Sequence, residues 1–281
     1  MNPVTFPILF GLISALTYGA ADFTGGMVAK RTNTYGIVIL GHIGSLVLLT
    51  ICALALRESL PGLKDWLIGM LAGVSGCAGL VLLYRSLADG QMSLVSPVSA
   101  LVGAGVPVLV GVFTEGLPGK WMLVGFVLAL VAIWLIAQTG KISLVNILAR
   151  IRLPVLSGVC FGFFFVGIHF ASSQSIVWPL VATRLGSIPS LLLFTHLTHQ
   201  TWLPERKYWK SIGLISLLDS AGNVFYSLAS QLGRLDLAAV LVSLYPGSTV
   251  VLARLILKEK VTWIQWVGIL LALVALACIS K

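Results

Sequence analysis

A few polar and ionisable side chains interrupt the long apolar stretches of this sequence, and they are the first candidates for chemistry. Asp219 and Asn223 are four residues apart, so they would share one face of a helix. Arg184 interrupts another apolar stretch and could pair with Asp219 or bind an anionic group of a ligand. Such a charge costs about 2.5 to 3.5 kcal/mol at the centre of a membrane, so it needs a partner or a water-filled cavity. The alternative is an internal ion pair that serves only helix packing.

Asp22 and His169 hold corresponding places in two similar segments, 11–23 and 158–170, and form a second pair of candidates. If the two segments cross the membrane in opposite directions, each side chain would lie near one mouth of a shared cavity. Loss of hydration penalises a charged carboxylate, so proton coupling or gating through Asp22 is a hypothesis. For His169, a hydrogen-bonded histidine that packs between helices is the simpler interpretation.

Three further side chains inside apolar stretches are candidates for substrate binding. Tyr18 and Tyr245 combine an apolar ring with a polar tip, as side chains of ligand cavities often do. His42 is a candidate because its segment, which ends at Ser45, matches the segment that begins at Arg184. Glu115 stands just before the last apolar stretch of the first half, and we expect it to cap that helix.

The sequence predicts no metal, no cofactor and no catalytic centre. The four cysteines fall in separate apolar stretches, and neither paired carboxylates in a recognisable arrangement nor closely spaced metal ligands occur. The formal net charge is +9, but Lys and Arg stand singly or in pairs at the ends of apolar stretches. That distribution suits lipid headgroups better than nucleic acid, which we do not expect as a partner.

The composition requires a membrane. Of the 281 residues, 58% are hydrophobic and only 10% are charged. About 20 apolar residues cross a hydrocarbon core of about 30 Å, so the chain is long enough for ten transmembrane helices and little else. We therefore predict an all-α, multi-pass protein of the cell membrane (plasma or inner membrane). The apolar windows place its spans at 6–29, 36–56, 66–88, 92–113, 119–138, 153–173, 178–198, 210–230, 237–257 and 263–280.

The ten predicted spans divide into two similar halves. We expect a first five-helix repeat over 1–140, a polar linker over 141–152 and a second repeat over 153–281. Because five is odd, the second repeat would enter the membrane from the opposite side. Two inverted copies have two nearly equivalent arrangements, which is the symmetry that alternating access uses.

Short motifs in both halves resemble the EamA-type repeat of the drug/metabolite transporter superfamily. They are Tyr84-Arg-Ser-Leu-Ala88 with Ser93-Leu-Val-Ser-Pro97 in the first half, and Tyr226-Ser-Leu-Ala229 with Tyr245-Pro246 in the second. The resemblance covers essentially the whole chain and implies a ten-helix metabolite transporter with a central cavity shared by both halves. His42 departs from the family pattern, which often has arginine there, whereas Arg184 keeps it.

These observations favour a secondary transporter that moves a small organic metabolite, amino-acid-like or drug-like, by alternating access. Its partners would be that solute and the lipid bilayer, and it would act as a monomer or a homodimer. A structural or accessory membrane protein is the main alternative, and an intramembrane enzyme is a weaker one. Orientation stays open: more Lys and Arg fall on the side of the linker, which places both termini outside, whereas the resemblance implies cytoplasmic termini.

Overall fold

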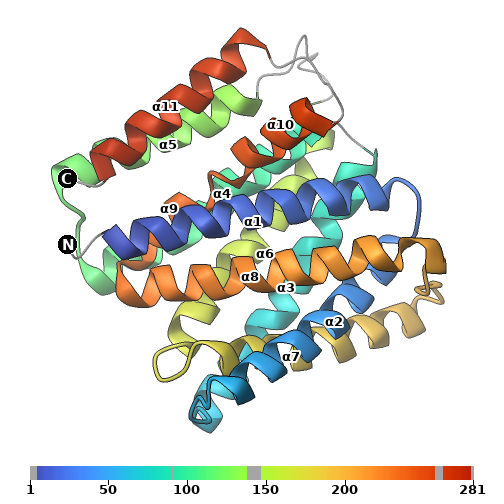
Figure 1. Cartoon of the computed structure of the whole chain (residues 1–281). Helices are drawn as coiled ribbons and strands as arrows, with labels where there is room; N and C mark the ends of the chain where they lie inside the picture. The colour runs from blue at the N-terminus through green and yellow to red at the C-terminus, as the bar shows by residue number, and fades with distance from the viewer. Residues whose placement is uncertain (1–4, 90–91, 138–146, 257–261, 280–281) are drawn as a thin grey trace.

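The computed structural model describes residues 5–89, 92–137, 147–256 and 262–279, and these ranges are helical with short turns and contain no strand (Figure 1). The first half forms α1 (Thr5–Ala29), α2 (Thr34–Ala55), α3 (Leu63–Asp89), α4 (Met92–Glu115) and α5 (Lys120–Ala137). The second half forms α6 (Ile147–Ala171), α7 (Val177–Leu197), the 3-10 turn η2 (Arg206–Tyr208), α8 (Trp209–Leu232), α9 (Leu235–Val242), α10 (Tyr245–Ile256) and α11 (Trp263–Ile279).

The helices have the length and the surface of membrane spans. Eight helical segments of the described residues are long and apolar enough to cross a bilayer, and the apolar stretch Lys120–Leu135 is shorter. Large apolar side chains cover the outside of the bundle, among them Phe113 at 87% and Leu71 at 71% exposure. Such a surface suits lipid rather than water. The chain is a multi-pass membrane protein, as the composition predicts.

The ninth predicted span, 237–257, is interrupted in the structure. It is divided into α9 and α10, and the chain turns between them at Ser243 and Leu244. Pro246 has no backbone N–H to bond to the preceding turn, and its ring collides with the carbonyl four residues earlier. Pro246 therefore favours an interruption at this point, which the continuous apolar window of the sequence hides.

Part of the predicted polar linker is helical. Helix α6 begins at Ile147, which lies within the segment 141–152. Apolar residues at 147 and 148 continue the helix toward its N-terminus, ahead of the polar Arg150 and Arg152. The rest of the predicted linker, 141–146, lies outside the described residues.

The two halves pack on each other with a two-fold pattern of helix pairs. Helix α1 packs along α8 and α3 packs along α6, while α2 meets α7 and α5 meets α11 (Figure 1). If α1 to α5 correspond to α6 to α11 in order, exchanging the halves converts each of these pairs into another or into itself. The α5–α11 pair runs antiparallel, with α5 ending where α11 begins (Figure 1).

The turns between helices gather at two ends of the bundle. We call the end where α1 begins and α11 ends the terminal end, and the opposite one the linker end (Figure 1). The terminal end carries the turns 56–62, 116–119, 172–176 and 233–234, and the linker end carries 30–33 and 198–205.

Candidate functional site

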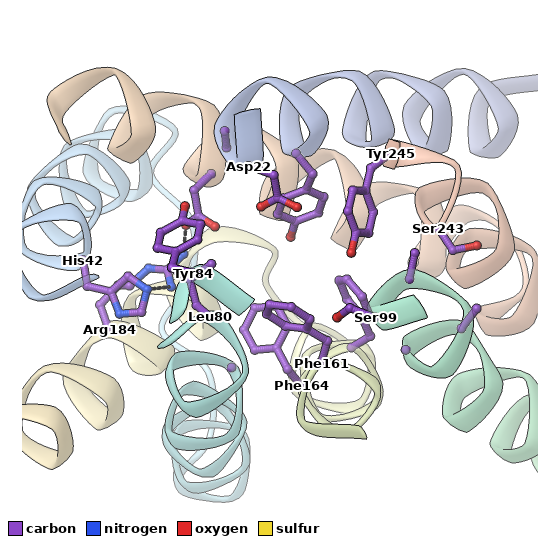
Figure 2. A pocket seen from close by; sticks show the side chains of 18 residues that line it. Asp22, His42, Leu80, Tyr84, Ser99, Phe161, Phe164, Arg184, Ser243 and Tyr245 are labelled. Carbon is purple, nitrogen blue, oxygen red and sulfur yellow. Dashed lines mark hydrogen bonds and ion pairs between the residues drawn. The ribbon is translucent and has the colours of Figure 1, made fainter. Parts of the chain in front are cut away.

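A cavity lies inside the bundle, between helices of both halves (Figure 2). Its empty space is about 680 Å3, including the part that is continuous with the outside. The polar side chains that line it are Tyr18, Asp22, His42, Tyr84, Ser99, Arg184, Asp219, Ser243 and Tyr245.

Arg184 organises the polar side of this cavity. Only 2% of Arg184 is exposed, and its Nη2 donates to Asp219 Oδ2 over 2.7 Å. Its Nε donates to Ser45 Oγ over 2.9 Å, and its Nη1 lies 3.3 Å from His42 Nε2. Each of the three guanidinium nitrogens therefore has a protein partner, and the buried charge is compensated.

The tautomer of His42 follows from these contacts. Arginine can only donate, so His42 Nε2 must accept from it and carries no proton. His42 Nδ1 then carries the ring proton and donates to Ser187 Oγ over 2.8 Å. His42 is therefore a neutral side chain in this arrangement.

This network joins corresponding residues of the two halves. His42 and Ser45 on α2 correspond in sequence to Arg184 and Ser187 on α7. His42 bonds to Ser187, while Arg184 bonds to Ser45, so each helix uses the same two positions for the same contacts. The matching segments of the sequence thus meet in space where α2 and α7 cross.

Asp22 faces the cavity without a protein partner. Its side chain points into the space from α1, and 7% of the residue is exposed (Figure 2). Among the described residues, no group donates a hydrogen bond to its carboxylate or forms an ion pair with it. The Oη of Tyr18, one helical turn earlier, is also buried without a hydrogen-bond partner in the described part of the chain. Buried polar groups normally have partners, so both atoms are suited to a ligand.

The break between α9 and α10 places two further polar residues at the cavity. Tyr245 begins α10, and its Oη donates to the carbonyl of Ser96 over 3.2 Å. Ser243 lies in the break itself and lines the same space. Broken helices line the central sites of many transporters because their free backbone groups are tolerated only beside a cavity.

The sequence analysis did not assign several lining residues to the site. The aromatic residues Phe161 and Phe164 form the wall opposite Tyr245, and Ser99 and Tyr84 lie beside them (Figure 2). Tyr84 belongs to the Tyr84-Arg-Ser-Leu-Ala88 motif, so the motif could have indicated it as a candidate for the site. The choice of helix face depends on packing: a Cβ on Gly25 would lie 2.3 Å from Tyr84 Cζ, so glycine leaves room for this ring.

Two candidates from the sequence lie outside the cavity lining. Asn223 is buried beneath Asp219, and its Nδ2 donates to the Asp219 carbonyl over 2.7 Å. His169 lies at the end of α6, where its Nε2 is 3.8 Å from Glu115 Oε1. Asp22 thus lines the cavity, whereas His169 lies at the terminal end beside Glu115. Their roles in proton coupling or gating stay predictions.

Polar contacts between the halves close the terminal end. The Glu115 carboxylate accepts from the backbone N–H of Leu235, and Arg234 donates to the Glu115 carbonyl over 3.2 Å. Glu115 therefore caps α9 of the other half, not α5 as we expected. At the same end, the Glu58 carboxylate accepts from Ser175 Oγ and from the N–H of Val177 at the start of α7.

Metal binding finds no support in the part of the chain that the structure describes. There, no three His, Cys, Asp or Glu side chains stand close enough together to hold a metal ion. The four cysteines are free, and each lies on a separate helix.

The comparison with protein families matches the two halves separately. The model of the EamA-like transporter family matches residues 5–138 and again 149–281. The chain belongs to the EamA-like transporter family. This confirms the resemblance that the sequence motifs indicated, and it explains the two-fold pattern of contacts as the packing of two EamA repeats.

Other comparisons add the fold but no activity. No curated protein matches the EamA-family chain described here. A crystal structure titled "Crystal structure of protein" is similar to it, with a TM-score of 0.77 over 97% of this chain and 95% of that one. The two sequences are 13% identical, so this similarity shows the fold alone.

Proposed function

We propose that this EamA-family protein is a secondary transporter that moves a small organic metabolite across the cell membrane by alternating access. The observation that carries the proposal is the polar cavity enclosed by helices of both repeats, with buried groups that have no partner in the described part of the protein. The transporter would have ten membrane spans in two inverted five-helix repeats, with α9 and α10 together forming the ninth. It would act as a monomer or a homodimer.

The closed terminal end fits one state of such a cycle. Asp22, Tyr84 and Ser99 lie in the parts of their helices nearer the linker end, so the cavity extends toward that end. The terminal end is held by Glu58 and Glu115, each of which caps a helix of the other repeat. In the state related by the two-fold exchange, these caps would open and equivalent contacts would form at the linker end.

The exchange gives Asp22 and His169 alternating roles. They occupy equivalent positions in the two repeats, and in this state Asp22 faces the cavity while His169 is packed at the closed end. Opening the terminal end would uncover His169 and enclose Asp22. Proton coupling through Asp22 remains a hypothesis within this cycle, as do an amino-acid-like or a drug-like solute.

Flux measured in proteoliposomes tests the proposal. The purified chain, reconstituted and loaded with a panel of labelled metabolites, should exchange at least one of them faster than empty vesicles do. Arg184→Gln should abolish this exchange because it removes the ion pair with Asp219 at the cavity. Arg206→Gln, at an exposed position in η2, is the matched control and should exchange normally. Absence of flux across the whole panel would favour an accessory membrane protein instead.

A further inference from the structure

One carboxyl group in the cavity lining has no cationic partner among the described residues. Arg184 and Asp219 neutralise each other across a 2.7 Å contact, and His42 is neutral because it accepts a hydrogen bond from Arg184. Asp22 remains, with a buried carboxylate and no partner among the described residues. No other Asp, Glu, Lys or Arg of the described ranges lines this space. Among the described residues, the cavity therefore presents one carboxyl group without a cationic partner.

An anionic ligand finds no unengaged arginine or lysine among the described residues that line the cavity. Arg184 is the one such residue there, and each of its nitrogens is already engaged by Asp219, Ser45 or His42. A ligand carboxylate would have to displace Asp219 and leave that side chain buried without a partner. The same argument disfavours a zwitterion, whose carboxylate would meet this closed network.

The walls around the Asp22 carboxyl group are aromatic. Tyr18, Tyr84 and Tyr245 line the cavity together with Phe164 and Phe165 (Figure 2). Faces of such rings attract ammonium groups, and the attraction is strongest where water is excluded. The unpartnered Tyr18 Oη adds one hydrogen-bonding position beside them.

We infer that the cavity binds an organic monocation, an ammonium compound with an aromatic or apolar body, whose charge is held by Asp22. The inference rests on the proposed function, because it assigns the substrate class of the same cavity. The body of the ligand lies against the aromatic walls, and the ammonium group replaces the missing partner of the Asp22 carboxylate.

Matched ligands that differ only in charge test this inference without any flux measurement. Calorimetric titration of the purified full chain in detergent would compare 2-phenylethylamine, which is protonated at neutral pH, with the neutral 2-phenylethanol. The anionic 3-phenylpropanoate and the zwitterion phenylalanine complete the series. We expect the ammonium compound to bind about tenfold more tightly than the alcohol, and the two carboxylates to bind more weakly still.

Variants assign this preference to Asp22. Asp22→Asn should remove the preference for the ammonium compound and leave binding of the alcohol unchanged, whereas Asp22→Glu should retain the preference. Asp65→Asn is the matched control, since Asp65 is also 7% exposed but lies outside the cavity lining. Thermal unfolding of each variant shows whether it is folded, and the charge-retaining Asp22→Glu gives a result even if Asp22→Asn is unstable.

The outcomes separate this inference from the proposed transport. Equal binding of amine and alcohol, an undiminished preference in Asp22→Asn, or no binding by any member of the series would overturn the inference. An ammonium preference without flux in liposomes would support the binding site and count against transport. Flux of anionic or zwitterionic solutes without a cation preference would support transport and count against the cation-binding site.

Discussion

His42 and Arg184 occupy equivalent positions in the two repeats and contact each other, with 3.3 Å between His42 Nε2 and Arg184 Nη1. The helices that carry them, α2 and α7, cross at this point, so the pair lies where the two-fold pattern of the bundle maps onto itself. One position holds arginine and the other a neutral histidine. A single carboxylate, Asp219, is bonded to this pair, and it compensates the charge of one arginine but not of two.

Arg184→Gln should destabilise the protein because it leaves Asp219 buried without its cation. Removal of one partner of a buried pair typically costs about 3 to 5 kcal/mol. The double variant Arg184→Gln/Asp219→Asn should recover much of this loss, since no buried charge remains. Unfolding in mixed micelles measures the stability of the single and of the double variant. A single variant as stable as the parent would contradict the structural role of the pair.

The position of His42 should tolerate a neutral acceptor but not a second cation. His42→Gln keeps an oxygen that can accept from Arg184, and we expect little change in stability. His42→Arg places two guanidinium groups together with one carboxylate, so it should lower the melting temperature. Thermal unfolding of the two purified variants makes the comparison. Equal melting temperatures would show that Arg184 does not depend on a neutral neighbour.

Gly73 should be indispensable for the contact between α3 and α7. A Cβ at this position would lie 1.9 Å from the carbonyl oxygen of Thr183, which is backbone and cannot turn aside. Gly73→Ala should therefore force the helices apart and cost about 1 to 3 kcal/mol. Gly41→Ala is the control, because no atom lies within 4 Å of its added Cβ. Unfolding measurements should show that Gly73→Ala is less stable than Gly41→Ala. Similar stabilities of the two variants would contradict the close packing of α3 on α7.

Loosening the closed terminal end should expose residues behind it. Glu115→Gln weakens the cap on α9 by removing a charge from the bond to the Leu235 N–H. Ser172, buried at this end, serves as the reporter after its replacement by cysteine in a background without the four native cysteines. We expect its labelling by a hydrophilic thiol reagent to accelerate by about tenfold.

The control for that experiment is Glu205→Gln, an exposed carboxylate at the linker end that pairs with Lys207. It should leave the labelling of the reporter unchanged. Equal acceleration by both variants would mean a general loss of stability, and no acceleration by Glu115→Gln would contradict the role of this cap in closing the terminal end.

Cysteines at Gly62 and Gln200 should label from opposite sides of the membrane, because their turns lie at the terminal end and the linker end. Labelling of intact cells with an impermeant reagent, before and after permeabilisation, measures this directly. The side that labels first at position 62 also decides the orientation that charge distribution and family resemblance leave open. Labelling of both positions from one side would contradict the ten-span arrangement.

The sequence by itself determined most of the helices and the family. Stretches of about 20 apolar residues can be satisfied only as spanning helices, so hydrophobicity locates them within a few residues. The pairing of Arg184 with Asp219 could be proposed as well, because two opposite charges in separate apolar stretches have few other solutions. The repeat was visible because equivalent residues recur in the same order.

Only the tertiary structure decided which faces of the helices meet. The rotation of each helix depends on packing against helices distant in the chain, so Tyr84 and Ser99 line the cavity while Asn223 does not. The break before Tyr245 depends on the same packing, since a membrane proline may end a helix or merely bend it. His169 lies outside the cavity because the terminal end of the bundle is closed by contacts between the halves. The two ends are related by the repeat, so the sequence does not distinguish the closed end from the open one.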